Sequence, residues 1–142
     1  SAASDVYKRQ KILLILDEVQ CGVGRSGKFF AFEHAKIKPD IVPIAKGIGG
    51  GFPVGACLLN KKVTTCMGVG THGSTFGGNP LGSAIAKRSL ELLEEEGLIE
   101  NSRVMGDYFK QSLLELNSPI IKEIRGKGLW LGVEIDQSYI TG

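Results

Sequence analysis

The sequence predicts an α/β fold with a mainly parallel sheet and flanking helices. Two apolar runs, residues 11–16 and 41–45, have the length and continuous hydrophobicity of strands that are covered on both faces. Two longer segments after Asn79 instead repeat their apolar residues at the spacing of a helix. Glycines dominate the connections between these elements.

Short elements alternate in the first half of the chain. After the first apolar run, residues 29–37 predict a short helix that stops before Pro39, because the residue before a proline avoids the helical region. The run at residues 41–45 predicts a second buried strand, and Val54 to Leu59 predict a third.

Two amphipathic helices are predicted next. Asn79 is a suitable cap for the first helix, and Pro80 fits its first turn. Gly97 interrupts the helical pattern, and a second helix continues until Pro119 ends it. Their apolar residues fall on one face and their charged residues on the other.

The last part of the chain predicts a pair of strands. Residues 120–124 and 129–135 are rich in apolar residues and flank a turn that contains Gly126 and Gly128. We expect this segment to begin a second, smaller domain of the α+β class.

Composition limits the classes of function. The chain has 142 residues, of which 42% are hydrophobic and 23% charged, as in a globular domain with a core. Its 17 basic residues are scattered among 15 acidic ones, which makes a nucleic-acid partner unexpected. No apolar run approaches the roughly 20 residues of a membrane helix, and residues 1–10 lack a signal-peptide core. We therefore expect a soluble, cytoplasmic protein without a membrane partner.

Cysteine and histidine do not form a metal-binding pattern. The three cysteines, Cys21, Cys57 and Cys66, are odd in number and lack the spacing of a zinc site, so we expect free thiols. The two histidines, His34 and His72, form no cluster of ligands in the sequence. The sequence therefore predicts no metal.

Asp17 and Lys46 are the most informative candidates for chemistry. Asp17 follows the first apolar run, where a carboxylate could hold a positive charge on a ring nitrogen. Lys46 lies between the second apolar run and a group of glycines, where a flexible backbone lets another molecule approach. An amine in such a place can form a Schiff base with an aldehyde. Together they suit a pyridine-based cofactor.

Two nucleotide-binding interpretations are weaker. Residues 22–27 match the G-x-G-x-x-G spacing of a dinucleotide site, but Asp17 and Glu18 just before them would repel a pyrophosphate. The same glycines, ending at Lys28, have the spacing of a phosphate loop. Phe29 then stands where a serine or threonine should bind the metal.

Several segments together resemble the class III pyridoxal-phosphate aminotransferases. The resemblance covers roughly residues 11–136, and one of its motifs is similar to the acetylornithine and ornithine aminotransferase branch. It implies part of the large domain of the type I pyridoxal-phosphate transferase fold. The segments that carry it are Leu16 to Gly27, Glu33-His34, Pro39 to Ile41, Ala45 to Ala56, Gly70 to Leu81 (the branch motif), and Arg125 to Leu129.

The resemblance implies catalytic roles for two residues. Lys46 would bind pyridoxal 5'-phosphate as a Schiff base and then move the proton of the substrate carbon. Asp17 would pair with the protonated pyridine nitrogen of the cofactor. The implied reaction transfers an amino group from N-acetylornithine or ornithine to 2-oxoglutarate in arginine biosynthesis.

The resemblance also implies binding roles. Val19 would pack against the cofactor ring, and Gln20 would reach its phenolic oxygen. Glu18 either belongs to the same cofactor-binding set or only braces the loop. Thr75 would bind the cofactor phosphate across a subunit boundary, with Ser74 near the substrate, so a homodimer is implied.

Two arginines have two possible roles. Arg25 and Arg125 could each bind a carboxylate of a substrate. We favour ion pairs that hold the surrounding loops, since the planar guanidinium group serves either role.

Several parts of the family pattern are absent from this sequence, including the N-terminal phosphate loop and the terminal Arg-x-x-Pro-Pro element. We therefore expect a fragment with three parts: an unmatched leader (1–10), the central and C-terminal part of the large domain (11–96), and a connecting helix with the start of the C-terminal domain (97–142). Two alternatives remain, another class III omega-aminotransferase acting for example on 4-aminobutyrate, and an inactive fragment that only docks to a partner.

Overall fold

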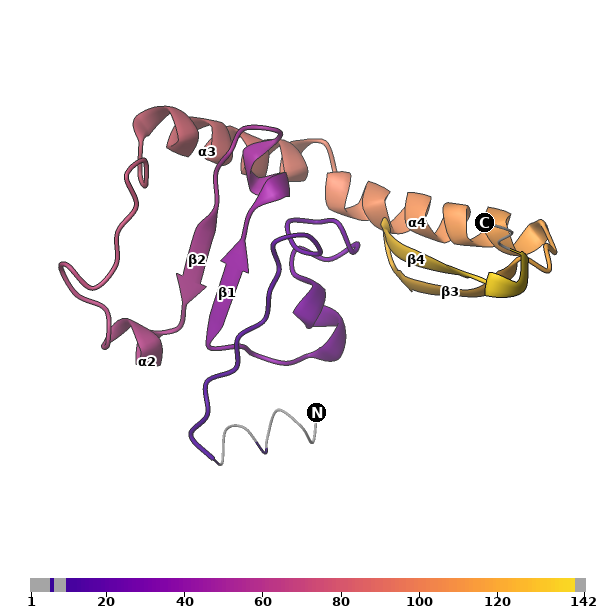
Figure 1. The fold of residues 1–142 in the computed structure, drawn as a ribbon. Helices are drawn as coiled ribbons and strands as arrows, with labels where there is room; N and C mark the ends of the chain where they lie inside the picture. The colour runs from indigo at the N-terminus through magenta and orange to yellow at the C-terminus, as the bar shows by residue number, and fades with distance from the viewer. Residues whose placement is uncertain (1–5, 7–9, 140–142) are drawn as a thin grey trace.

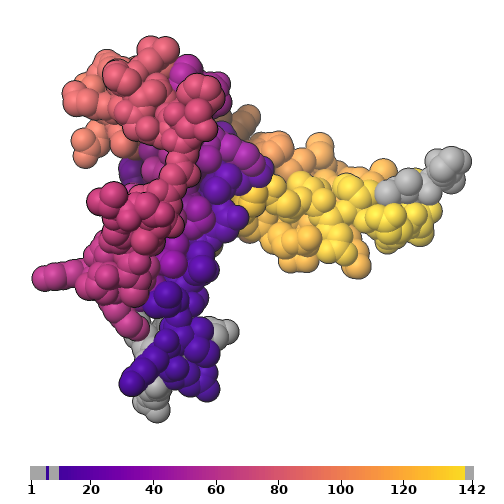
Figure 2. Space-filling model, turned by 60° about the vertical axis from the view of Figure 1, so that its left-hand side comes forward, coloured from indigo at the N-terminus to yellow at the C-terminus, as the bar shows by residue number. Residues whose placement is uncertain are grey.

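The structure is a computed structural model that describes residue 6 and residues 10–139. Helix α3 lies across one end of a small sheet, and helix α4 continues away from it beside a β-hairpin (Figure 1). Figure 2 shows this second part, coloured orange to yellow, projecting from the rest of the chain. The elements are η1 (Ala31–Ala35), β1 (Ile41–Ile44), η2 (Lys46–Gly49), β2 (Ala56–Leu59), α2 (Lys61–Thr64), α3 (Pro80–Glu95), α4 (Leu98–Glu115), β3 (Ile121–Lys127), β4 (Trp130–Ile135) and η3 (Gln137–Tyr139).

The small sheet is mixed. β1 and β2 are antiparallel, with Ile41 opposite Leu59 and Ile44 opposite Ala56. The extended segment before Asp17 runs parallel to β1 and contacts it through a bridge between Ile15 and Ile41. The α/β class is confirmed by the related structures described below, while the parallel pairing that we predict occurs here only on one side of β1.

The prediction of a buried strand at residues 11–16 is wrong for this chain. A single bridge replaces a strand ladder, and the side chains of Ile12, Leu13 and Ile15 are 49%, 42% and 57% exposed. The apolar sequence is typical of a strand covered on both faces. Burial of its side chains, however, also needs neighbouring elements on both faces and at the edge opposite β1. The described residues supply a neighbour only along β1.

The core lies between the sheet and helix α3. Its buried members come from the loop after Asp17, from β1 and from η2. Half-buried side chains, most of them from η1 with its cap residue and from α3, pack around them, so η2, which begins at Lys46, is held against the long helix. The buried residues are Val23, Val42, Ile44 and Ile48, and the surrounding ones are Phe30, Phe32, Val54, Ala86, Leu90 and Leu93.

Two short elements differ from the prediction. The helix expected at residues 29–37 is the five-residue 3-10 helix η1, which ends where Lys36 adopts a left-handed backbone with φ of 53°. Strand β2 forms at the expected place but is largely exposed, and the thiol of Cys57 within it is accessible. Among the described residues, β2 pairs with a strand at one edge only, through β1.

The helical predictions are confirmed. The Asn79 side chain accepts a hydrogen bond of 2.7 Å from the backbone N–H of Gly82 at the start of α3. Gly97, with φ of 61°, separates α3 from α4, and α4 ends before Pro119. Among the described residues, neither helix has a stretch long and apolar enough to cross a membrane.

The strand pair at the end of the chain is also confirmed, with a small shift of its turn. β3 runs through Lys127, which pairs with Trp130, so the connection is Gly128 and Leu129. The hairpin packs against α4 where the backbones of Gly106 and Gly128 lie close together. A side chain on Gly106 of α4 would overlap the carbonyl group of Gly128.

The same turn contacts the glycine-rich loop after Asp17. The backbone N–H of Leu129 donates to the Arg25 carbonyl at 3.0 Å, and the Ser102 hydroxyl donates to the same oxygen at 2.8 Å. Gly128 leaves no room for a side chain because the backbone of Ser26 and Gly27 lies against it. Helix α4, the hairpin and the loop therefore meet at one point.

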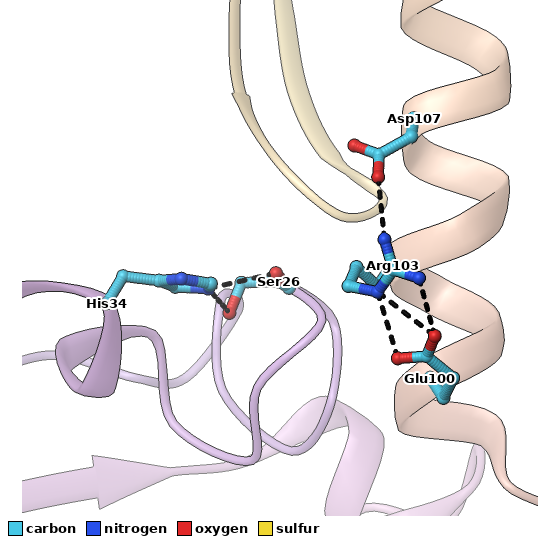
Figure 3. A network of polar contacts seen from close by, with 5 residues as sticks. All are labelled: Ser26, His34, Glu100, Arg103 and Asp107. Carbon is cyan, nitrogen blue, oxygen red and sulfur yellow. Dashed lines mark hydrogen bonds and ion pairs between the residues drawn. The ribbon is translucent and has the colours of Figure 1, made fainter.

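His34 and Arg103 lie on opposite sides of this contact (Figure 3). The Nε2 atom of His34 lies 3.0 Å from the Ser26 carbonyl oxygen and 3.3 Å from its hydroxyl. On α4, Arg103 pairs with Glu100 at 2.6 Å and with Asp107 at 3.0 Å. These ion pairs lie on the helix surface and contribute little to stability on their own.

Replacing Gly106 by alanine tests the close contact. Alanine favours a helix by about 1 kcal/mol, but the overlap with Gly128 should outweigh this gain and lower the free energy of unfolding by about 2 kcal/mol. Trp130 is the only tryptophan and lies beside the contact, so its fluorescence in a urea titration reports the change. Gly73→Ala, where the added methyl group meets nothing within 4 Å, is the control. Equal midpoints for the two variants would contradict this packing.

Candidate active site

Lys46 stands at the carboxyl end of β1. The strand ends at Ile44, and Lys46 opens the 3-10 helix η2 with a left-handed backbone, φ of 51°. Positive φ is uncommon for a residue with a side chain and often marks a functional site. The next residue is Gly47, which lets the chain pass close to Val23: a Cβ placed there would lie 3.3 Å from the Val23 Cβ.

The Lys46 amine is held by Gln20. Its Nζ atom donates a hydrogen bond of 2.6 Å to the Gln20 side-chain oxygen. Both residues line a cavity of about 650 Å³. Residues 22–25 and Gly47 form one side of this cavity, and the hairpin residues Leu129 to Leu131 contribute to its lining.

Asp17 lies at the same end of the sheet. The backbone N–H of Leu16 donates to Ile41, and that of Glu18 donates to Pro43, each at 3.0 Å, so Asp17 runs beside β1. Its carboxylate accepts a 2.9 Å hydrogen bond from the backbone of Val19. Asp17 is exposed and does not line the 650 Å³ cavity. The structure thus places Asp17 and Lys46 at one end of the sheet. The parallel pairing of Ile15 with Ile41 sets Asp17 beside Pro43, three residues before Lys46.

Glu18 is a buried brace in this structure. Only 2% of its surface is exposed, and its two carboxylate oxygens accept hydrogen bonds of 2.9 Å from the backbone N–H groups of Ala31 and Phe32. A carboxylate at the first N–H groups of a helix is a favourable pairing. The geometry therefore favours the bracing role, one of the two that the sequence leaves open.

Ser74 and Thr75 are not brought to Lys46. They lie in the long exposed connection between α2 and α3, and neither lines the cavity. In the same connection, His72 contacts the Thr71 hydroxyl at 3.3 Å. Their cofactor-phosphate and substrate roles remain predictions.

The two arginines differ. Arg125 pairs with Glu123 at 3.1 Å and Glu134 at 3.0 Å, the ion-pair role that we favour for it. Arg25 lines the cavity, and within residues 10–139 it takes part in none of the ion pairs. No group of three potential metal ligands comes together in the same part of the chain.

Sequence reasoning misses two features of the site. Ser102 and Trp130 line the cavity because α4 and the hairpin pack against the loop at Arg25. No local sequence pattern predicts this long-range contact. The sequence also gives no sign that Cys21 lies against Glu18, with its thiol 3.4 Å from the carboxylate. Partial burial, and then the Glu18 charge, raise the pKa of the Cys21 thiol to about 11.

The geometry can be compared with known proteins. The family model of the class III aminotransferases matches residues 1–141. The chain belongs to the class III aminotransferases. It is 47% identical over 134 residues to an ornithine aminotransferase of Brevibacillus brevis, a match that covers 94% of this chain and 34% of that protein.

Solved structures of the family agree. An ornithine aminotransferase from Toxoplasma gondii superposes with a TM-score of 0.91 at 38% identity, over 97% of this chain and 34% of that one. An acetylornithine aminotransferase from Elizabethkingia anophelis gives 0.88 at 38% identity, over 94% and 34%. This class III aminotransferase chain thus spans about a third of the length of these relatives. The family depends on pyridoxal 5'-phosphate.

Replacing Glu18 by alanine should destabilise the chain. The change leaves the partly buried backbone N–H groups of Ala31 and Phe32 without these partners, which should lower the free energy of unfolding by about 2 to 4 kcal/mol. Urea unfolding measures the change. Glu94→Ala, at an exposed position of α3, should alter it by less than about 0.5 kcal/mol. A small effect of Glu18→Ala would rule out the bracing role.

Cys21 should resist alkylation. Its raised pKa keeps the thiol protonated, so iodoacetamide at about pH 8 should modify the exposed Cys57 and Cys66 first, as read by peptide mass spectrometry. The folded chain retains this proton where the unfolded chain loses it. Stability should therefore fall as pH rises from 9.0 towards about 11. Alkylation of Cys21 as fast as that of Cys57 would contradict the raised pKa of the Cys21 thiol.

Proposed function

We propose that this chain is the lysine-bearing part of an aminotransferase that moves an amino group from ornithine or N-acetylornithine to 2-oxoglutarate. The observation that carries the proposal is the Lys46 amine, held at the end of β1 beside a cavity with glycine-rich walls. Membership of the family and the ornithine aminotransferase relatives support it. A role in arginine biosynthesis and a cytoplasmic location are part of the same proposal.

The residues present fit pyridoxal 5'-phosphate. The amine of Lys46 lies on a cavity wall in contact with the Gln20 amide, and the exposed carboxylate of Asp17 lies at the same end of the sheet. When bound, the cofactor supplies an electron-withdrawing ring that stabilises negative charge on the substrate carbon. Lys46 would hold the cofactor at its aldehyde carbon and carry the proton that leaves the substrate carbon.

The neighbouring residues would orient the ring. Asp17, at the same edge of the sheet, would hold its carboxylate towards the positive ring nitrogen. Val19 would pack on a ring face, and Gln20 would reach the phenolic oxygen. Glu18 would act indirectly by fixing the loop that carries the other three, because its oxygens are engaged with η1.

The phosphate and the substrate would be bound from a second subunit. Ser74 and Thr75 lie in an exposed connection away from their own Lys46, which supports a homodimer in which they complete the site of the partner. Each site would then need two chains. An amino donor and a 2-oxo acid would be the small-molecule partners.

Two alternatives remain. One is an omega-amino donor such as 4-aminobutyrate in place of ornithine. The other is an inactive fragment that only docks to a partner, which the exposed side chains of Ile12, Leu13 and Ile15 favour. A donor screen with 2-oxoglutarate separates the first alternative, and cofactor retention by the 142-residue chain addresses the second.

The Lys46 assignment can be tested by trapping. We expect a version extended to the length of its relatives to bind pyridoxal 5'-phosphate, and borohydride to fix the cofactor on the peptide that contains Lys46. Lys46→Ala should abolish this adduct and lower transamination by orders of magnitude. Lys28→Ala, at an exposed position outside the cavity lining, should leave both unchanged. An undiminished adduct in Lys46→Ala would refute the proposal.

A further inference from the structure

The hydrogen bond between Gln20 and Lys46 has a role besides any contact with a cofactor. We propose that Gln20 is a positioning residue, whose side-chain oxygen holds the free amine of Lys46 at a fixed point on the cavity wall. The inference rests on the proposed function, since only a reacting amine needs a fixed place. It concerns the state in which the amine is bonded to no other group.

The backbone that carries Gln20 is fixed on three sides. Val19 donates its N–H to the Asp17 carboxylate at 2.9 Å. The Glu18 N–H donates to Pro43 of β1, and its carbonyl accepts from Gly22, each at 3.0 Å. Gln20 lies inside this turn, so its side chain starts from a defined position relative to β1.

The backbone that carries Lys46 is fixed as well. Lys46 has a left-handed conformation and opens η2, where Ile48 donates to Ala45 at 3.4 Å and Gly50 donates to Gly47 at 3.2 Å. Gly47 packs directly on Val23, three residues after Gln20. The two segments are thus in contact, and only side-chain torsions can change the distance between the amine and the amide oxygen.

A neutral amide suits this task. A lysine side chain has four rotatable bonds and loses considerable conformational entropy when it is ordered. In the described residues Lys46 forms none of the ion pairs, whereas Lys87 on α3 pairs with the Glu91 carboxylate at 2.6 Å. A hydrogen bond to an amide orders the amine in advance of its reaction and is weaker than one to a carboxylate. The amine can therefore leave it more easily.

Labelling of the amine tests the proposal without the cofactor. The cofactor-free 142-residue chain is treated with an amine-acylating reagent, and mass spectrometry gives the initial rate at Lys46 relative to Lys87. The contact restricts the orientation of the nitrogen and its approach to the reagent, so Gln20→Leu should raise this relative rate by about two- to tenfold. Gln20→Glu keeps an acceptor at the same reach and should keep the slow rate.

Two further variants complete the design. Gln20→Asn withdraws the acceptor by one methylene and should label as fast as Gln20→Leu. Gln111→Leu, which removes a surface amide that donates to Glu115 on α4, should leave the rate unchanged. Labelling of Gln20→Leu at the original relative rate would overturn the proposal.

If Gln20→Leu loses its fold, Gln20→Asn decides. Faster labelling of Gln20→Asn than of the unaltered chain supports the positioning role, and equal rates refute it. The two proposals can fail separately. Absence of the borohydride adduct at Lys46 would defeat the proposed function while the labelling rates still report the hydrogen bond, and unchanged labelling would defeat the role of Gln20 alone.

Discussion

The seating of residues 16–22 on β1 is the constraint on which the site depends. Two backbone hydrogen bonds fix this segment beside the strand, and the buried carboxylate of Glu18 ties it to η1. A carboxylate with 2% exposure is costly to bury unless both oxygens are bonded. Because those bonds are made, the backbone on either side of Glu18 is fixed. Asp17 and Gln20 therefore start from defined positions beside β1.

A second constraint joins α4 and the hairpin to the glycine-rich loop that follows this turn. Gly106, Gly128 and the backbone at Ser26 approach so closely that no side chain fits between them. Ser102 and Leu129 then satisfy the Arg25 carbonyl in the space that remains. The cavity beside Lys46 therefore has one wall from the loop and another from the hairpin, and its volume depends on glycines distant from the chemistry.

The sequence predicts features that depend on nearby residues. Helix α3 is predictable because a cap at Asn79 and a 3.6-residue period are local signals. Lys46 stands out because glycines follow it. The buried strand predicted at residues 11–16 does not form, since burial depends on neighbours outside the local pattern. The contact of Ser102 with Arg25 joins residues 77 positions apart, and no local pattern contains it.

The candidate residues divide into a set beside β1 and a set in the connection between α2 and α3. Lys46 follows the end of β1 and bonds Gln20, and Asp17 lies between two residues whose backbone is hydrogen-bonded to β1. This order is what proton transfer at a fixed carbon requires. Ser74 and Thr75 have no such support in the described residues and lie outside the cavity lining. A group that must hold an anionic phosphate needs several donors fixed together. An exposed connection gains that order most directly by packing on a second molecule, which is the physical reason for proposing a phosphate contact between subunits.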